Sequence, residues 1–257
     1  MAKEHAREAV PSEAERMRLA AALQTLDPAA PPCAVAVCGA WLETARRLVA
    51  LPGSFNPPHA AHVALLRAGI EAVATANPIG ITAGAYVSSV RTVDKEHVSG
   101  IPLADRLWLL CRLLETPAAA VVATNRGLYV EQAAALSDLC PYLEELVFVV
   151  GFDKIVQIFD ARYYADRDAA LGDLFGRARF LVAPRDEHTA TEVAELLERP
   201  ENRPFAAVAT LSIDPALAHL SSTLARTQAL HRRLPANLVP PIVARYVEAT
   251  ACFRDVQ

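Results

Sequence analysis

Two histidines three residues apart follow a proline-rich turn in residues 51–62, LPGSFNPPHAAH. Pro57 and Pro58 favour an extended backbone and keep a helix from beginning before His59. A helix that begins there places His59 and His62 on one face of its N-terminus, where unpaired N–H groups and the helix dipole favour an anion. The pattern therefore predicts a phosphate-binding site. The alternative is that the two histidines are only solvated or packed side chains, which would have the same sequence pattern.

A strand and a helix must position this turn. The apolar run at residues 48–51 predicts a short buried strand, and residues 60–74 predict a helix. Gly53 lies between them, where the missing side chain lets the backbone come close to a ligand. The unit is a strand, a stiff turn and a helix start.

A second stretch, residues 220–226 (LSSTLAR), predicts another anion site. Ser221 is a suitable N-cap residue, so the N–H groups and hydroxyls of Ser222 and Thr223 would lie at the mouth of a helix. Arg226 would follow one turn later. A capped helix with a surface arginine is the alternative reading of this stretch.

Apolar runs alternate with helical stretches along the rest of the chain. Strands are predicted at residues 33–38, 48–51, 85–90, 118–123, 146–150, 179–183 and 206–209, and helices at 12–26, 41–47, 60–74, 103–114 and 130–139. This alternation predicts the α/β class, a doubly wound, Rossmann-like parallel sheet whose ligands lie at the carboxyl ends of the strands. Residues 1–45 are predicted as an N-terminal helical extension and linker, and residues 46–257 as the main domain.

Composition limits the classes of function. Hydrophobic residues make up 53% of the 257 residues and the formal net charge is −4, which favours a folded chain without the basic field that nucleic-acid binding needs. The five cysteines include no C-x-x-C pair, so neither a zinc site nor a disulfide framework is indicated. The charged N-terminus and the lack of a long apolar run predict a cytoplasmic protein without a membrane partner.

Together, the two stretches resemble the two halves of the signature of the nucleotidyltransferase superfamily with the H-x-G-H motif. The early half is G-S-F-N-P-P-H-A-A-H and the late half is S-S-T-L-A-R, and the match is closest to the nicotinamide or nicotinate mononucleotide adenylyltransferases. Ala61 stands where the family usually has glycine, and Leu220 stands in place of isoleucine. The resemblance extends from about residue 48 to 245 and identifies residues 46–257 as a nucleotidyltransferase domain.

The resemblance implies transfer of AMP from ATP to nicotinamide or nicotinate mononucleotide, with Mg²⁺ carried by ATP and no metal ligands in the protein. It assigns catalysis to His59, His62 and Arg226. ATP binding would add Gly53, Ser54, Phe55, Ser222 and Thr223. The mononucleotide would contact Asn56, Lys95, Arg106 and Asp153. For three of these the plain alternatives are a solvated loop lysine (Lys95), a surface arginine (Arg106) and a helix-capping aspartate (Asp153).

Two other functions fit the same residues. One is another nucleotidyltransferase of the superfamily, for example with a pantetheine phosphate as acceptor. The other is a nucleotide-binding regulator or ATP hydrolase that lacks transfer activity, which the substitution at Ala61 keeps open. Homo-oligomerisation is also left open, as is the preference between the two pyridine mononucleotides.

Overall fold

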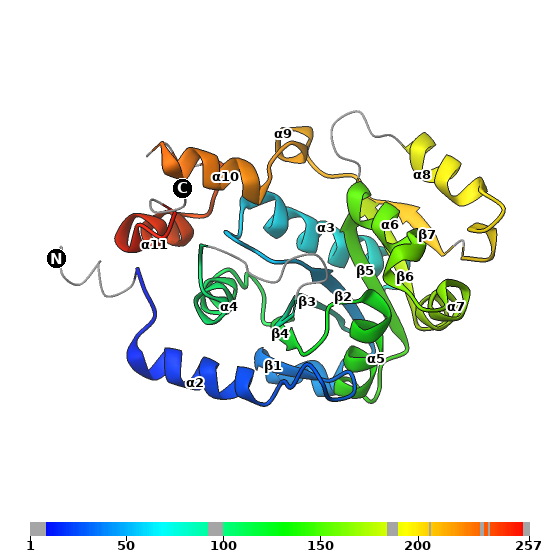
Figure 1. Cartoon of the computed structure of the whole chain (residues 1–257), viewed down its shortest axis with the longest axis horizontal. Coiled ribbons are helices and arrows are strands. Elements are labelled where there is room, and N and C mark those ends of the chain that lie inside the picture. The colour runs from blue at the N-terminus through cyan, green and yellow to red at the C-terminus, as the bar shows by residue number, and fades with distance from the viewer. Residues whose placement is uncertain are drawn as a thin grey trace.

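Seven strands form one sheet in the computed structural model, which describes residues 9–91, 100–183, 190–205, 207–231, 234–235 and 237–253. The strands are β1 (Ala34–Cys38), β2 (Arg47–Pro52), β3 (Thr82–Ser89), β4 (Ala119–Thr124), β5 (Glu145–Gly151), β6 (Ala178–Ala183) and β7 (Val208–Thr210). Their spatial order is β1-β4-β3-β2-β5-β6-β7 (Figure 1). All neighbours are parallel except β1, which pairs antiparallel with β4. The predicted Rossmann-like α/β fold is therefore confirmed.

The strand order of the sheet reverses beside β2, which makes this position its topological switch point. The chain proceeds from β2 through β3 to β4 on one side, then returns to place β5 on the other side of β2. The carboxyl ends of β2 and β5 thus flank the crevice where ligands bind in doubly wound sheets. The proline turn that follows β2 starts at this point.

Helices cover both faces of the sheet. They are α2 (Glu13–Gln24), α3 (Ala60–Ala76), α4 (Leu103–Arg112), α5 (Tyr129–Leu139), α6 (Phe152–Phe159), α7 (Arg167–Arg177), α8 (Ala190–Glu198), α9 (Pro215–Ala218), α10 (Ser222–Leu230) and α11 (Pro241–Thr250). Within the described residues, 3₁₀ turns lie at Ala40–Thr44, Ala161–Tyr163 and Arg203–Phe205. The predicted helix at 41–47 is wrong in its second half, because Arg47 begins β2 and its guanidinium donates to the Ile79 and Gly80 carbonyls.

Alternating side chains of the strands divide the core in two. Val49 and Val149 face α2, α3, α4, α10 and α11, whereas Leu48 and Phe148 face α5, α6, α7 and α8. Helix α3 comes very close to the sheet at Gly69, where a β-carbon would lie 2.6 Å from Val149 Cγ2 and 2.9 Å from Val49 Cγ1. Close packing of the helix that carries the histidines therefore needs a residue without a side chain.

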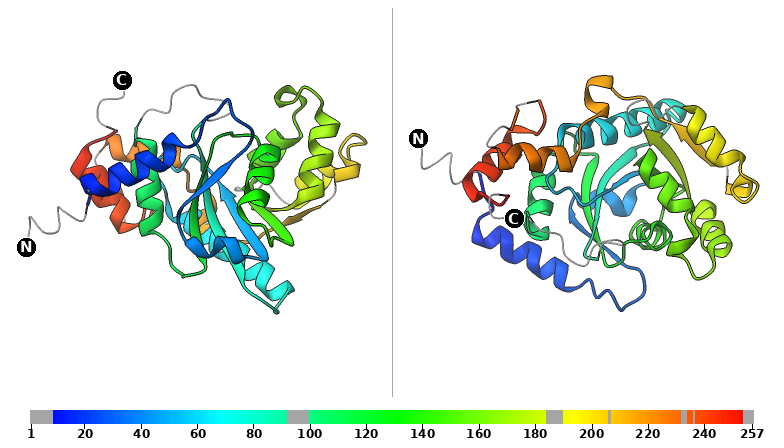
Figure 2. Two further views of the ribbon diagram at one scale, coloured as in Figure 1. Left: turned by 90° about the horizontal axis from the view of Figure 1, so that it is seen from below. Right: turned by 45° about the horizontal axis from the view of Figure 1, so that its top comes forward.

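Helix α2 of the predicted extension packs against α4 (Figure 2). Ser12 and Glu15 form a capping box at the start of this helix. Glu15 also accepts from the Trp108 indole at 3.1 Å, and Arg16 pairs with the buried Asp105 at 3.2 Å. The hydroxyl of Tyr246 in α11 donates to the same Asp105 carboxylate at 2.6 Å. Helix α4 is thus held between an early and a late segment of the chain.

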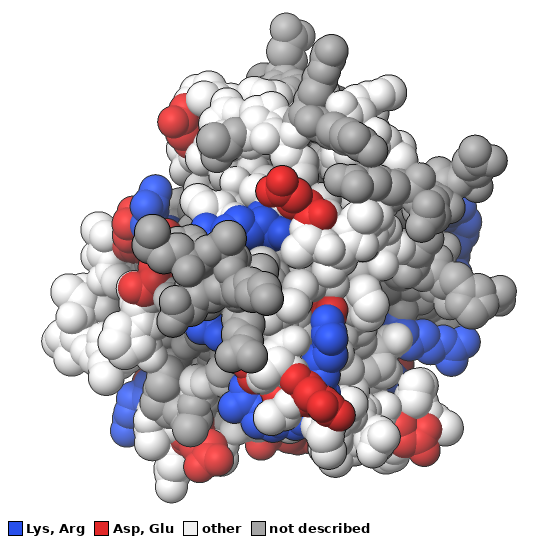
Figure 3. Space-filling model, turned by 90° about the vertical axis from the view of Figure 1, so that its left-hand side faces the viewer, with Lys and Arg blue, Asp and Glu red and all other residues white. Residues whose placement is uncertain are grey.

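On the face shown in Figure 3, the basic and acidic side chains of the described residues are interspersed. No helix among the described residues is long and apolar enough to cross a membrane.

Candidate active site

The turn after β2 is fixed by contacts at both of its ends. The Gly53 N–H donates to the Val87 carbonyl at 2.9 Å, which extends the pairing of β2 with β3. Phe55 adopts a positive φ of 48° and is buried, with its ring edge-on to His62 at 4.8 Å between centroids and to Tyr86 at 5.6 Å. The predicted stiff turn is therefore anchored by an aromatic side chain beneath the histidines.

His59 and His62 lie together at the start of α3. Their rings stack with centroids 3.6 Å apart, and the His59 N–H donates to Nδ1 of His62 at 3.1 Å. His59 is buried and forms the N-cap, as the prolines predicted. The next N–H group, that of Ala60, donates to the Leu238 carbonyl at 3.1 Å, so the segment before α11 supports this helix end.

Helix α10 brings the second predicted stretch to the same turn. Ser221 is its N-cap and accepts from Leu224 N–H. The Ser222 hydroxyl donates to the Pro57 carbonyl at 2.9 Å. Arg226 donates to the Asn56 carbonyl at 2.7 Å and to the Thr223 hydroxyl at 2.9 Å. Two stretches about 165 residues apart in sequence therefore meet in space, as their combined pattern predicted.

Arg106 reaches the turn from α4. It is 6% exposed, one of its Nη atoms donates to the Ser54 carbonyl, and its buried Nε has no hydrogen-bond partner among the described residues. Burial lowers the pKa of this guanidinium to about 10. The group nevertheless stays charged at neutral pH, so the site contains a buried cation whose hydrogen-bonding capacity is not filled. The surface alternative for Arg106 is wrong.

Asn56 is buried beneath these cations. Its side-chain oxygen accepts from Ile101 N–H at 3.0 Å, and a β-carbon on Gly100 would lie 2.9 Å from the same oxygen. The side chain predicted to contact a mononucleotide is therefore also a support for the turn.

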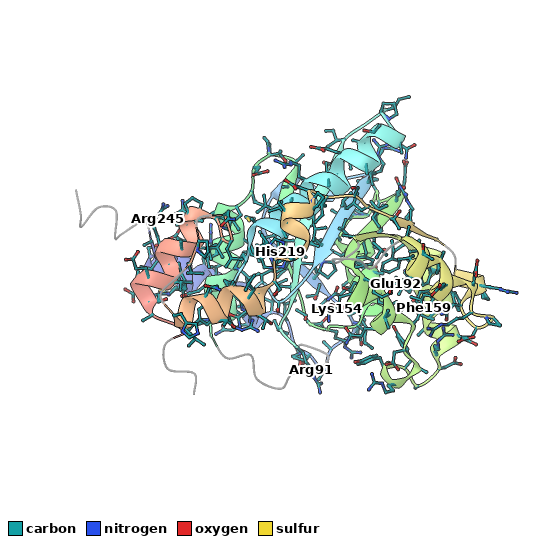
Figure 4. All side chains as sticks on the ribbon, turned by 90° about the horizontal axis from the view of Figure 1, so that it is seen from above. Arg91, Lys154, Phe159, Glu192, His219 and Arg245 are labelled. Atoms are coloured by element: carbon teal, nitrogen blue, oxygen red, sulfur yellow. The ribbon has the colours of Figure 1, made fainter. Side chains whose placement is uncertain are left out.

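Two further residues were predicted to contact the mononucleotide, Lys95 and Asp153. Lys95 lies outside the described residues. Asp153 is exposed in the first turn of α6, directly after β5 and hence beside the carboxyl end of β2. Figure 4 shows Arg91 and Lys154, which follow β3 and begin α6, near this edge of the sheet. Neither cation was predicted as a site residue, although each is a basic residue shortly after a parallel strand.

The charges of the site suit a phosphate ester. Within the described part of the chain, neither Arg106 nor Arg226 makes an ion pair; both donate to neutral oxygens. Their remaining N–H groups and the two imidazoles can therefore bind an anion. No group of three or more His, Cys, Asp or Glu side chains in the described ranges could hold a metal ion. The donors of the two arginines and the histidine pair fit an anion.

The class that the structure defines is a Rossmann-like α/β fold, with a histidine pair and two arginines at the switch point where ligands bind in doubly wound sheets. No protein-family model matches the chain. The chain is 26% identical over 159 residues to a protein of Schizosaccharomyces pombe (strain 972 / ATCC 24843) named "Putative nicotinamide mononucleotide adenylyltransferase". The match covers 58% of this chain and 58% of that relative, so the chain spans less than two thirds of the relative's length. This distant similarity supports a nucleotidyltransferase-like role.

Proposed function

We propose that this protein transfers the adenylyl group of ATP to the 5′-phosphate of nicotinamide or nicotinate mononucleotide, releasing pyrophosphate. The observation that carries the proposal is the meeting of the histidine pair with Arg106 and Arg226 around one turn, with both arginines bound only to neutral oxygens within the described residues. The motif resemblance and the distant relative's name support the same reaction.

The reaction needs positioning more than a nucleophile of the protein. The acceptor phosphate attacks the α-phosphorus of ATP in line, a bond forms to the acceptor oxygen, and the bond to pyrophosphate breaks. The negative charge that develops on pyrophosphate is best stabilised by donors already fixed in place. We assign this role to His59 and His62, whose rings are held by stacking and by the start of α3.

The remaining residues hold the two substrates. Ser222, Thr223 and Arg226 at the start of α10 would bind the β- and γ-phosphates, and the backbone of residues 53–55 would lie along the bridging oxygens. Arg106 would bind the phosphate of the acceptor mononucleotide, with Asn56 and Asp153 as further contacts. Mg²⁺ enters with ATP as part of the substrate.

The test is pyrophosphate release with ATP and Mg²⁺ in the presence of nicotinamide mononucleotide, nicotinate mononucleotide or neither, with the dinucleotide identified by mass. We expect release that depends on one of the two acceptors. Acceptor-independent release of phosphate would replace the proposal with an ATP hydrolase, and ATP binding without turnover would replace it with a nucleotide-binding regulator. Turnover with a pantetheine phosphate would assign a different transferase of the superfamily.

A further inference from the structure

Asp105 is a buried carboxylate in the first turn of α4, outside the set of residues assigned to the substrates. Both of its oxygens are bound by side chains of other helices. Arg16 of α2 donates from Nε to Oδ1 at 3.3 Å and from Nη2 to Oδ2 at 3.2 Å. The Tyr246 hydroxyl of α11 donates to Oδ2 at 2.6 Å. The carboxylate therefore joins α4 to both of the helices between which it lies (Figure 1).

The residue that follows Asp105 is Arg106, whose guanidinium reaches the turn after β2. The Arg106 N–H donates to the Pro102 carbonyl at 3.0 Å, so both residues belong to the first turn of α4. Because successive side chains leave an α-helix about 100° apart, the place of the Asp105 carboxylate determines the direction in which Arg106 projects. The guanidinium donates to the Ser54 carbonyl, but its buried Nε has no partner among the residues that the structure describes. Its placement therefore depends largely on the backbone of α4.

We propose that Asp105 is a positioning residue for Arg106, which keeps the guanidinium at the turn after β2, where the acceptor phosphate binds. Arg16 and Tyr246 act through Asp105 by fixing its carboxylate. This role rests on the proposed function, which assigns Arg106 to the acceptor phosphate. Helix α2, in the N-terminal extension, thereby becomes part of the acceptor site.

Stability alone is a weak reason for such a buried group, because the desolvation of a carboxylate offsets much of the attraction to its partners. What the partners provide is a fixed position. Burial, and then the hydrogen bond to Asp105, raises the pKa of Tyr246, so its hydroxyl keeps its proton and remains a donor. Donors from two separate helices restrain the carboxylate more strictly than either donor would alone.

A second contact between α2 and α4 offers a matched control. Glu15 accepts from the Trp108 indole at 3.1 Å and from Arg112 at 3.2 Å, towards the other end of α4. The Arg112 side chain is 54% exposed and that of Arg16 is 48% exposed. Arg112→Met therefore removes an ion pair between the same two helices without touching Asp105.

The test measures the Kd of each pyridine mononucleotide and, separately, of Mg²⁺–ATP by calorimetry. Arg16→Met and Tyr246→Phe should each weaken mononucleotide binding by about tenfold, because the charged contact from Arg106 is misplaced. Their Kd for Mg²⁺–ATP should stay within about twofold of the wild type, since the proposed ATP contacts lie on α3 and α10. Arg16→Lys keeps the charge and should restore part of the mononucleotide affinity, and Arg112→Met should bind both ligands like the wild type.

Urea unfolding of each variant establishes that it is folded before titration. Unchanged mononucleotide binding in Arg16→Met and Tyr246→Phe would overturn the role of Asp105. An equal loss of affinity for both ligands, or the same loss in Arg112→Met, would overturn it as well, because either result shows a general loosening of the protein.

A probe that needs no transfer activity separates this role from the proposed function. In ¹⁵N-labelled protein, the Arg106 Nε–H signal is identified by its loss in Arg106→Met, and its shift is followed as inorganic phosphate is added. About tenfold weaker phosphate binding in Arg16→Met supports the role of Asp105 even where the wild type makes no dinucleotide, a result that refutes only the proposed function. Equal phosphate affinity in the two proteins, or no shift in the wild type, would overturn the role itself.

Discussion

Replacing Arg106 by methionine should separate the stability of the protein from its ability to bind a phosphate. Depression of the Arg106 pKa from 12.5 to about 10 corresponds to about 3 kcal/mol of disfavoured charge in the folded state. The sign follows from the cation: below pH 10 the guanidinium is charged in both states, so the folded protein bears the full cost, which disappears only as the pH rises from 10 towards 12.5. At neutral pH the cost is fully present.

The variant removes this cost together with one favourable contact. Arg106→Met eliminates the buried charge and loses the hydrogen bond to the Ser54 carbonyl, a bond from a charged donor worth about 1.5–3 kcal/mol. Methionine fills most of the vacated volume and adapts to irregular spaces. We therefore expect the free energy of unfolding to stay unchanged or to rise by up to about 1.5 kcal/mol.

Ligand binding should show the opposite effect. A ligand at 100 times its Kd stabilises a folded protein by about 2.7 kcal/mol. Urea unfolding at pH 7.5 with each pyridine mononucleotide in turn should show such a gain for the wild type and the loss of most of it in Arg106→Met, because a charged contact to the mononucleotide is missing. Arg67→Met is the matched control on the exposed surface of α3 and should change neither quantity by more than about 0.5 kcal/mol.

Two results would refute this reasoning. Destabilisation of Arg106→Met by more than about 2 kcal/mol without ligand would mean that the guanidinium is a structural group. An undiminished gain with both mononucleotides would mean that Arg106 does not contact the acceptor.

Three further predictions concern the elements that build the site. His62→Ala should lower kcat by about 10²–10³ in the pyrophosphate assay, since one fixed charge-stabilising donor is lost. The control is His231→Ala, which changes an exposed histidine at the other end of α10 and should retain normal turnover. Near-normal kcat in His62→Ala would contradict the assignment. Ser12→Ala should cost about 1 kcal/mol in urea unfolding at pH 7. The Ser12 backbone N–H and its hydroxyl both donate to the Glu15 carboxylate and lower its pKa, and Ser12→Ala removes only the hydroxyl. The part of the stabilisation that comes from the hydroxyl's bond to the carboxylate is present above pH 4.5 and fades as the pH falls further, whereas the bond from the Glu15 N–H to the hydroxyl persists. The wild-type advantage should therefore shrink in acid, and an advantage as large at pH 3 as at pH 7 would exclude the contribution of the carboxylate. Gly69→Ala should destabilise the protein by about 1–3 kcal/mol in urea unfolding, because the added methyl group overpacks α3 against the sheet. This cost exceeds the gain from the better helix propensity of alanine. A more stable variant would show that α3 can move away from the sheet.

The sequence predicted the parts of the site whose determinants are local. Pro57 and Pro58 determine where α3 begins, and Ser12 with Glu15 determines the start of α2; both starts are confirmed. The meeting of α10 with the turn was predicted because two stretches matched in order. The roles of the individual residues in catalysis and binding stay predictions.

Other features depend on contacts between distant segments. The burial of Arg106 follows from the packing of α4 between α2 and α11, which no local pattern encodes. Helix α7 was not predicted, although Asp166 caps it by accepting from the Ala169 N–H. The antiparallel direction of β1 is likewise set by its pairing with β4 and not by its composition.

The hydrogen bonds that hold the turn also determine at which point of synthesis the site can form. A chain is synthesised from its amino end, and elements can fold as they emerge. The histidine motif appears early, yet the carbonyls of Asn56 and Pro57 are bound from α10, and the first N–H of α3 is bound by Leu238. A nascent chain that ends before α10 would therefore display the motif without its supports. Nucleotide binding by growing chains should begin only after residue 238 has been added and has folded back onto α3.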